Sequence, residues 1–260
     1  MGILNVTPDS FSDGGMWRDP ARAVDHALAM VEAGADLIDV GGESTRPGAR
    51  PVPVEEELQR VIPVVAALAG ACAVPISVDT SAPEVMRAAA EAGAQLVNDV
   101  RALRRPGALD AVAGSGLAAC LMHMHGEPGT MQRSPVYPRG VVTEVREFLA
   151  ARVAACVAAG IPVRKLLVDP GFGFGKTLDD NYTLLAGLGG FETVGVPLLV
   201  GLSRKSMIGH LNDAPADRRL HGSVAAALLA VERGARIVRV HDVAATVEAL
   251  SVWCAIHRVD

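Results

Sequence analysis

The segment LLVDPGFGFGK, residues 166–176, shows in one stretch how this chain is built. Its apolar start is typical of a buried strand, and Asp169 follows directly, with three glycines after it. A carboxylate at the end of a buried strand is costly unless something binds it. Glycines let a loop pass close to a ligand because they carry no side chain. The segment therefore predicts a strand that ends at a binding site.

The same arrangement recurs along the chain, which gives the architecture. Three segments share a helix end, a glycine suited to a left-handed cap, and a short apolar strand. They are EAGADLIDV from Glu32, EAGAQLVND from Glu91 and ERGARIVRV from Glu232, with AAGIPVRKLLVDPG from Ala158 as a looser fourth copy. Four further strands are expected, at Gly2–Val6, Pro75–Asp79, Leu117–Met122 and Pro197–Gly201.

Amphipathic helices are predicted between these eight strands. Examples are Pro20–Ala33, Val54–Leu68, Pro83–Ala92, Val141–Ala159 and Gly222–Arg233. Strands and helices that alternate from end to end favour the α/β class, with apolar strands covered on both faces. We predict a single (β/α)8 TIM barrel, with one domain over residues 1–260. A doubly wound open sheet is the structural alternative, but eight alternations favour closure.

The composition argues against some classes of function and indicates a cellular compartment. Half of the residues are apolar and the formal net charge is −5, so a nucleic-acid surface, which usually needs a basic excess, is not expected. The four cysteines are widely spaced and suggest reduced cytosolic thiols. The longest apolar region, Val61–Val78, is interrupted by Pro63 and Pro75, which argues against a membrane span. We expect a cytoplasmic protein with no secretory signal.

Polar residues stand at nearly every predicted strand end, where ligands of such barrels bind. They are Asn5, Asp39, Asp79, Asn98, Asp169, Ser203, Lys205, Arg239 and His241. One polar strand end is ordinary, but a full set predicts a site. Two long loops, Thr7–Asp19 and Gly41–Pro53, are expected to cover it, and Arg46 in the second suggests contact with an anion.

Five motifs in this order resemble those of the dihydropteroate synthase family. They are MGILNVTPDSFSDGG, GGESTRPGA, LVDPGFGFGK, GLSRKS and RVHDV, and together they span nearly the whole chain. The resemblance implies a pterin-binding barrel that condenses 6-hydroxymethyl-7,8-dihydropterin diphosphate with p-aminobenzoate, releasing pyrophosphate and 7,8-dihydropteroate. It also implies Mg²⁺ with the diphosphate, sulfonamides as mimics of the aminobenzoate, and a homodimer. Family members usually carry a short lead before the first strand, whereas this chain begins almost on it.

The resemblance also implies a pterin pocket. Asp169 accepts from the pterin's amino and ring N–H groups, a charge-assisted arrangement. Asp79 and Asn98 complete the pocket, and Lys205 donates to the acceptor side of the ring. We expect Asp79 and Lys205 to be catalytic, with Asp79 stabilising the positive charge that forms as pyrophosphate leaves. Alternatively, Asp79 caps the next helix and Asn98 bonds backbone in a turn.

The remaining site residues are expected to hold the anions and the metal. Arg239 and His241 alternate on the last strand, so both point to one side and suit the diphosphate. Asn5 resembles the family's metal-contacting asparagine, a hard oxygen ligand suited to Mg²⁺. Alternatively, Arg239 forms a buried ion pair with a neighbouring aspartate, and His241 is a core histidine.

The p-aminobenzoate is expected beside the segment SRKS. Its carboxylate would lie near Ser203 at the start of a helix, a position that attracts anions. By resemblance, Thr45 and Phe174 line the aromatic ring, although Phe174 could equally be a hydrophobic anchor of its loop.

Two other motifs do not predict sites of their own, and two rival functions fit the sequence less well. The segment GFGFGKT lacks the spacing of a phosphate-binding P-loop by one residue. His123 and His125 do not predict a zinc site, because no Cys or His at helical ligand spacing accompanies them. A pterin-dependent methyltransferase would lack the Ser-Thr-Arg-Pro loop and the SRKS segment. A non-catalytic pterin-binding paralogue should have lost a motif residue, and none is missing.

Overall fold

Eight parallel strands form a closed ring in the computed structural model of the chain, which describes residues 1–7, 20–43, 52–126 and 135–257. The strands are β1 (Gly2–Asn5), β2 (Ile38–Gly41), β3 (Ile76–Asp79), β4 (Leu96–Asp99), β5 (Ala118–Met122), β6 (Leu166–Asp169), β7 (Leu199–Val200) and β8 (Ile237–Val238). Strands β1 to β6 pair in sequence order, and β7 pairs with β8.

Two bridges close the ring between these groups of strands. Val168 on β6 pairs with Leu198, just before β7, and Gly2 on β1 pairs with Val240, just after β8. The N–H of Ile3 also donates to the carbonyl of Val240 at 3.0 Å. The prediction of a TIM barrel is therefore confirmed, and the open sheet is excluded.

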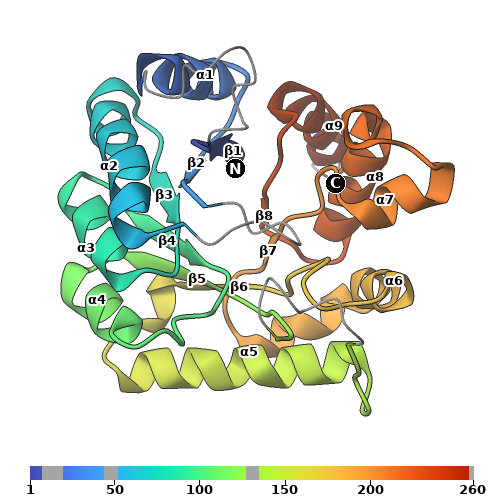
Figure 1. Cartoon of the computed structure of the whole chain (residues 1–260). Coiled ribbons are helices and arrows are strands. Elements are labelled where there is room, and N and C mark those ends of the chain that lie inside the picture. Colours follow the sequence, from blue (N-terminus) through green and yellow to red (C-terminus); the bar gives the residue numbers. More distant parts are fainter. Residues whose placement is uncertain (8–19, 44–51, 127–134, 258–260) are drawn as a thin grey trace.

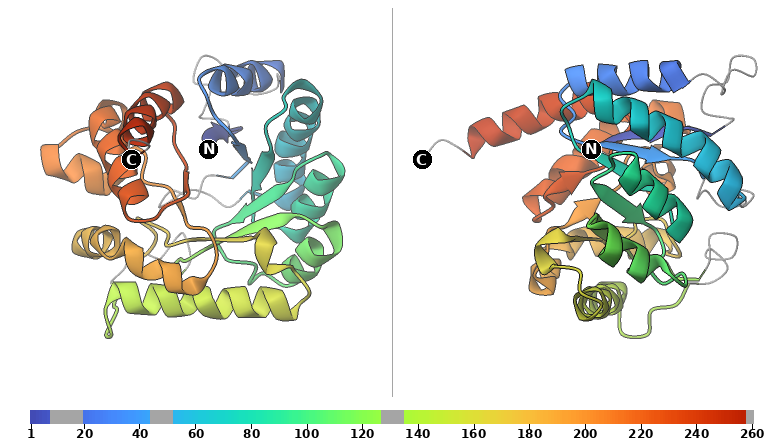
Figure 2. Two further views of the ribbon diagram at one scale, coloured as in Figure 1. Left: turned by 180° about the vertical axis from the view of Figure 1, so that it is seen from behind. Right: turned by 90° about the vertical axis from the view of Figure 1, so that its left-hand side faces the viewer.

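Helices surround the strands on all sides (Figure 1). They are α1 (Pro20–Glu32), α2 (Val54–Ala71), α3 (Pro83–Glu91), α4 (Ala108–Ser115), α5 (Val141–Ala158), α6 (Leu178–Ala186), α7 (Ser206–Asn212), α8 (Leu220–Glu232) and α9 (Val243–Ile256), with short 3-10 turns at Val163–Lys165, Leu188–Val194 and Ala216–Arg218. Figure 2 shows the ring from behind and from the side, where α2 and α3 lie in front of the strands. Within the described ranges, no helix combines the length and the apolar character that crossing a bilayer requires.

The helix bounds lie within three residues of the expected ones. Helix α2 continues three residues beyond the predicted end at Leu68, and Pro63 lies inside it. Val61, Val64, Val65 and Leu68 are all buried and form the face that packs on the sheet. Burial of such a stripe at 3.6-residue spacing is what holds a helix against a sheet. The apolar stripe therefore overrides the local cost of the proline.

The barrel interior changes from apolar to polar along its axis. One end is filled by a cluster of Met1, Leu96, Cys120 and Leu199, with Leu37, Ala118, Leu167 and Ile237 packed against it. Two positions further along their strands, the buried residues include Asp39, Asn98 and Asp169. Because side chains alternate along a strand, these polar groups share the inward face with the apolar cluster. The fold therefore gathers the polar side chains Asp39, Asn98 and Asp169 towards the carboxyl ends of the strands, here called the rim.

Candidate active site

Arg239 joins two carboxylates at the rim. Its Nε donates to Oδ2 of Asp39 at 2.5 Å, and its Nη2 donates to Oδ2 of Asp79 at 2.8 Å. The side chain of Asp39 is 0% exposed and that of Asp79 is 14% exposed. The ion-pair alternative for Arg239 is thus what the structure shows, with two aspartates instead of one. One guanidinium between two carboxylates leaves a formal charge of −1.

The titration of this trio follows from its burial. Burial raises the pKa of Asp79 to about 7; Arg239 opposes that rise, and the nearby negative charge of Asp39 adds to it. Burial alone would lower the pKa of Arg239, but the two carboxylates hold it above its usual value. The guanidinium therefore stays charged, while Asp79 changes charge near neutrality.

Asn98 completes this group from the neighbouring strand. Its Nδ2 donates to Oδ2 of Asp39 at 3.2 Å, so its side chain faces the site and does not bond a turn. Within the described parts of the chain, Oδ1 of Asn98, Oδ1 of Asp39 and Oγ of Ser77 are buried without a hydrogen-bond partner. An unpaired buried polar group costs about 1–3 kcal/mol. Such a cluster of acceptors is suited to a ligand that carries several N–H groups.

Asp169 provides a second acceptor on β6, and it is 5% exposed. Its Oδ1 accepts from the N–H of Gly171 at 2.7 Å, and its backbone carbonyl accepts from the N–H of His123 at 2.9 Å. Burial raises the pKa of Asp169, and the charge of Lys205 is the largest opposing influence. The carboxylate is therefore fixed by the backbone at the end of its strand.

Lys205 lies between Asp169 and the glycine-rich loop. Its Nζ donates to the carbonyl of Phe172 and stands over the ring of Phe174, 4.6 Å from the ring centre. Burial lowers the pKa of Lys205 to about 8, against the pull of Asp169. An ammonium on an aromatic face is a cation–π contact. The structure therefore places Lys205 on the ring of Phe174 and close enough to Asp169 for their charges to interact.

Ser203 and His241 meet on neighbouring strand ends. Oγ of Ser203 accepts from the N–H of His241 at 3.2 Å and lies 3.0 Å from its Nδ1. Arg204, the next residue, has a left-handed backbone with φ of 58°. That conformation is uncommon for a residue with a side chain and needs support from its surroundings.

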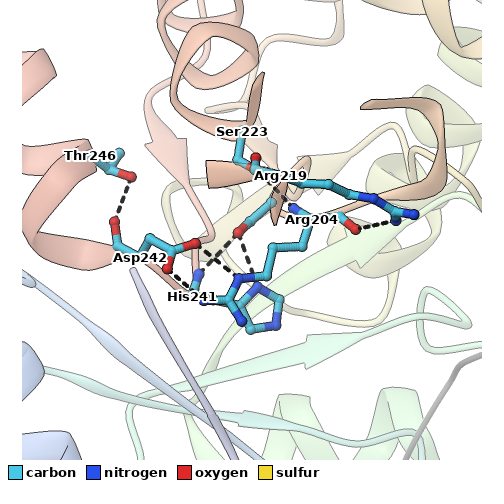
Figure 3. A network of polar contacts seen from close by, with 7 residues as sticks. Arg204, Arg219, Ser223, His241, Asp242 and Thr246 are labelled. Atoms are coloured by element: carbon cyan, nitrogen blue, oxygen red, sulfur yellow. Dashed lines mark hydrogen bonds and ion pairs between the residues drawn. The ribbon is translucent and has the colours of Figure 1, made fainter. Parts of the chain in front are cut away.

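The support for Arg204 is a polar network that joins its turn to α8 and to the start of α9 (Figure 3). Its guanidinium donates to both oxygens of Asp242, at 2.5 and 3.0 Å. Its N–H donates to Oγ of Ser223 at 2.9 Å, and its carbonyl accepts from Arg219 at 2.9 Å. The network fixes the turn whose two flanking residues, Ser203 and Lys205, face the site.

Asn5 faces the same gap as Asp79. A side chain added at Gly41 would lie 3.7 Å from Oδ2 of Asp79 and 3.8 Å from Oδ1 of Asn5. Both are hard oxygen donors next to a position where no side chain intervenes, which fits a Mg²⁺ ion that keeps most of its waters. No group of three or more His, Cys, Asp or Glu suited to a metal is found among the described residues.

Two predicted site residues, Thr45 and Arg46, lie outside the described residues, as do most of the two long loops. The strand-end pattern predicts neither the partners of Asp39 nor the burial of Glu57. Asp39 was recognised only as a strand end, yet it contacts both Asn98 and Arg239. Glu57 is 3% exposed, and the signal for its burial was available, because it stands four residues before buried Val61 on α2.

Comparison with known proteins agrees with this geometry. Residues 1–241 match the family described as pterin binding enzyme. The dihydropteroate synthase of Escherichia coli strain K12 is 59% identical over 252 residues, which is 97% of this chain and 89% of that protein.

Two solved structures from Xanthomonas albilineans are also similar. Dihydropteroate synthase with 4-aminobenzoic acid has a TM-score of 0.94 at 57% identity, over 100% of this chain and 93% of that chain. The same enzyme in complex with 7,8-dihydropteroate has a TM-score of 0.91 at 54% identity, over 100% and 94%. The chain belongs to the dihydropteroate synthase family of pterin-binding enzymes.

Proposed function

We propose that this chain condenses 6-hydroxymethyl-7,8-dihydropterin diphosphate with p-aminobenzoate to form 7,8-dihydropteroate and pyrophosphate. The observation that carries the proposal is the convergence of Asp39, Asp79, Asn98, Asp169 and Arg239 on one rim, in a chain 59% identical to a dihydropteroate synthase. Related structures hold 4-aminobenzoic acid and 7,8-dihydropteroate, the second substrate and the product of this reaction.

The unpaired acceptors are assigned to the pterin. Its amino group and ring N–H groups donate to the carboxylate of Asp169 and to Oδ1 of Asn98. Lys205 donates to an acceptor on the other side of the ring. A ligand that donates to buried acceptors supplies the hydrogen bonds that these atoms do not make with the described residues. This matching of donors to acceptors selects a pterin over a ring that lacks those N–H groups.

The reaction separates charge, and Asp79 is placed to assist it. The bond between the pterin's CH₂ carbon and the leaving oxygen breaks, and its electron pair departs with pyrophosphate. The lone pair of the amine nitrogen forms the new C–N bond, and the amine then loses a proton. A carboxylate about 4 Å from the developing cation supplies ~4 kcal/mol at an effective dielectric of about 20. The aromatic amine is already unprotonated, so no strong general base is needed.

We assign the leaving diphosphate and the aminobenzoate to the cationic side of the rim. Arg239 uses Nε and Nη2 for its aspartates and has Nη1 for a phosphate oxygen, and His241 stands beside it. Arg46, outside the described residues, is proposed to contact the same anion. The aminobenzoate carboxylate is assigned to Ser203, with Thr45 and Phe174 along the ring.

Mg²⁺ is proposed as the cofactor, held by Asn5 and by oxygens of the substrate diphosphate. When bound, it would neutralise charge on the leaving group. We expect condensation of the two substrates by the purified chain when Mg²⁺ is present, and loss of nearly all activity in excess chelator. The measurement is formation of 7,8-dihydropteroate, with Mg²⁺ restored as the control. Full activity in chelator would remove the metal from the proposal, whereas no product under any condition would overturn the function itself.

A second expected result concerns pH. Asp79 acts as the carboxylate, whose fraction grows as pH rises through its pKa of about 7. Lys205 acts as the ammonium, whose fraction falls as pH rises through its pKa of about 8. We therefore expect kcat/KM, which reports the free enzyme, to rise and then fall with a narrow maximum between those values.

The variant Lys205→Arg provides the control for that profile, because arginine keeps its charge throughout. In this variant the alkaline limb of the profile should shift to higher pH and the acidic limb should stay in place, whatever the effect on the maximum rate. A profile that is flat between about pH 6 and pH 9 would contradict the assigned protonation states.

A homodimer in the cytoplasm is also proposed. Helices α8 and α9 expose Leu229, Val252 and Ile256, with exposed fractions of 46, 60 and 65%. Exposed large apolar side chains on two adjacent helices support a self-association surface. Cys72, Cys120, Cys156 and Cys254 are all free thiols, in keeping with a reducing compartment. Sedimentation of the chain and of a Val252→Glu variant tests the association.

A further inference from the structure

Lys176, which ends the segment GFGFGK, and His123, which begins His-Met-His, have no role in the proposed chemistry, and they meet inside the protein. Lys176 is 3% exposed, and its Nζ lies 3.0 Å from Nδ1 of His123. The same Nζ donates to the carbonyl of Gly171 at 2.8 Å and to that of Phe174 at 3.2 Å. A lysine is rarely buried unless its charge is matched. Three acceptors match the three N–H groups of an ammonium.

His123 is the fixed member of this pair. Burial and the charge of Lys176 lower the pKa of His123 to about 2, so the ring is neutral and Nδ1 can accept a hydrogen bond from the Lys176 amine, whose own pKa burial lowers to about 7. The ring packs edge-on to Phe148, with centres 5.0 Å apart, and lies 6.1 Å from Tyr137. His123 therefore anchors the ammonium to β5 and α5, which do not belong to the glycine-rich loop.

The loop Gly171–Gly175 depends on side chains for its shape. Gly171, Gly173 and Gly175 all have left-handed backbones, and a side chain at Gly171 would collide with the carbonyl of His123. Lys176 holds the carbonyls at both ends of the turn from Gly171 to Phe174. Tyr137 donates to the carbonyl of Gly175 at 2.7 Å. Glycines of this kind have no intrinsic preference for the observed conformation, so the clamps decide it.

The loop carries Phe174, which lies under Lys205, whereas Asp169 is held independently. Asp169 belongs to β6, and its register with Met122 on β5 fixes its position. Phe174 has no strand pairing: Lys176 ties its carbonyl to the barrel, and its ring packs against Val100, Met122 and Met124. Loss of the clamp should therefore disturb the Phe174 side of the site much more than the Asp169 side.

We propose that Lys176 is a positioning residue that ties the Gly171–Phe174 turn to His123 and so holds Phe174 in place for the p-aminobenzoate ring. This inference rests on the proposed function for its kinetic consequence. The structural consequence does not depend on the proposed function, because the contacts of Lys176 exist in the free protein.

The main test is Lys176→Met, which keeps the length of the side chain and removes its three donors. KM for p-aminobenzoate should rise about tenfold, while affinity for a pterin without the diphosphate stays within about twofold of the original. Amide hydrogen exchange over residues 170–177 should become faster. Lys165→Met is the matched control, because Lys165 also donates to a backbone carbonyl, that of Gly116, but before β6 instead of after it.

A second pair of variants guards against a simple failure to fold. His123→Asn keeps an acceptor near the position of Nδ1, whereas His123→Leu removes it. The leucine variant should reproduce the KM increase of Lys176→Met, the asparagine variant should restore most of it, and the double variant Lys176→Met/His123→Leu should be no worse than either single one.

The following outcomes decide whether Lys176 positions the loop. An unchanged KM for p-aminobenzoate, or an equal loss of pterin affinity, would overturn the positioning role. Unchanged exchange over residues 170–177 in Lys176→Met would overturn the clamp even in an active enzyme. If the unmodified chain makes no product, the proposed function fails, but the exchange measurement still decides whether Lys176 holds the loop.

Discussion

Replacing Arg239 with methionine is expected to destabilise the protein by about 3–5 kcal/mol at neutral pH, because it leaves two buried carboxylates without their partner. The guanidinium lies 2.5 Å from Asp39 and 2.8 Å from Asp79, and its own side chain is only 19% exposed. Methionine fills part of the space but donates no hydrogen bond. The same change should abolish condensation, since the diphosphate loses its proposed cation.

The pH dependence of this loss has a definite sign. Without Arg239 the pKa of Asp79 should rise above its present value of about 7. Between the pKa of Asp79 in the unfolded chain, about 4, and its raised pKa in the folded variant, Asp79 is protonated in the folded state and ionised in the unfolded state. The free energy of unfolding therefore increases as pH falls through this range. The deficit of the variant should therefore be largest in alkaline solution and shrink in mild acid. Urea unfolding across this range measures it.

Two further variants make the comparison sharp. Arg236→Met removes an exposed arginine three residues earlier and should change stability by less than about 0.5 kcal/mol. Arg239→Met combined with Asp39→Asn removes one of the two unpaired charges and should recover part of the loss. Equal stability of Arg239→Met and the parent protein would mean that the ion pairs contribute nothing net.

Asp169→Asn is expected to weaken pterin binding by roughly 2–4 kcal/mol, which is ~30-fold to ~700-fold in the dissociation constant. The amide oxygen can still accept from the N–H of Gly171, so the loop should keep its shape. The amide NH₂ then replaces the oxygen that would face the pterin, and a donor meets a donor. Stability should change little, because burial already disfavours the charged form of Asp169.

Calorimetry at neutral pH with a pterin that lacks the diphosphate isolates this effect. Asp179→Asn is the matched control, because it changes the same side chain at an exposed position on α6 and should leave the affinity intact. Unchanged affinity in Asp169→Asn would remove Asp169 from the pocket and leave Asn98 and Asp39 as the acceptors.

The barrel and most of its rim were predictable from sequence because both depend on short-range periodicity. Eight apolar strands that alternate with helices favour a closed parallel ring, and residues that follow those strands then gather at one end. Asp79, Asn98, Asp169, Ser203 and Arg239 were found this way, and the structure brings them to the same rim. The five motifs then pointed to the family independently of that geometry.

Which of these residues pair with one another depends on the tertiary structure alone. Arg239 is 200 residues from Asp39 and 160 from Asp79, and nothing in the strand pattern says that one guanidinium bridges both. Lys176 and His123 are 53 residues apart and belong to separate motifs. Periodicity determines which face and which end a side chain occupies. Which atoms come within about 3 Å depends on barrel closure and on left-handed turns such as Arg204, and those are properties of the whole fold.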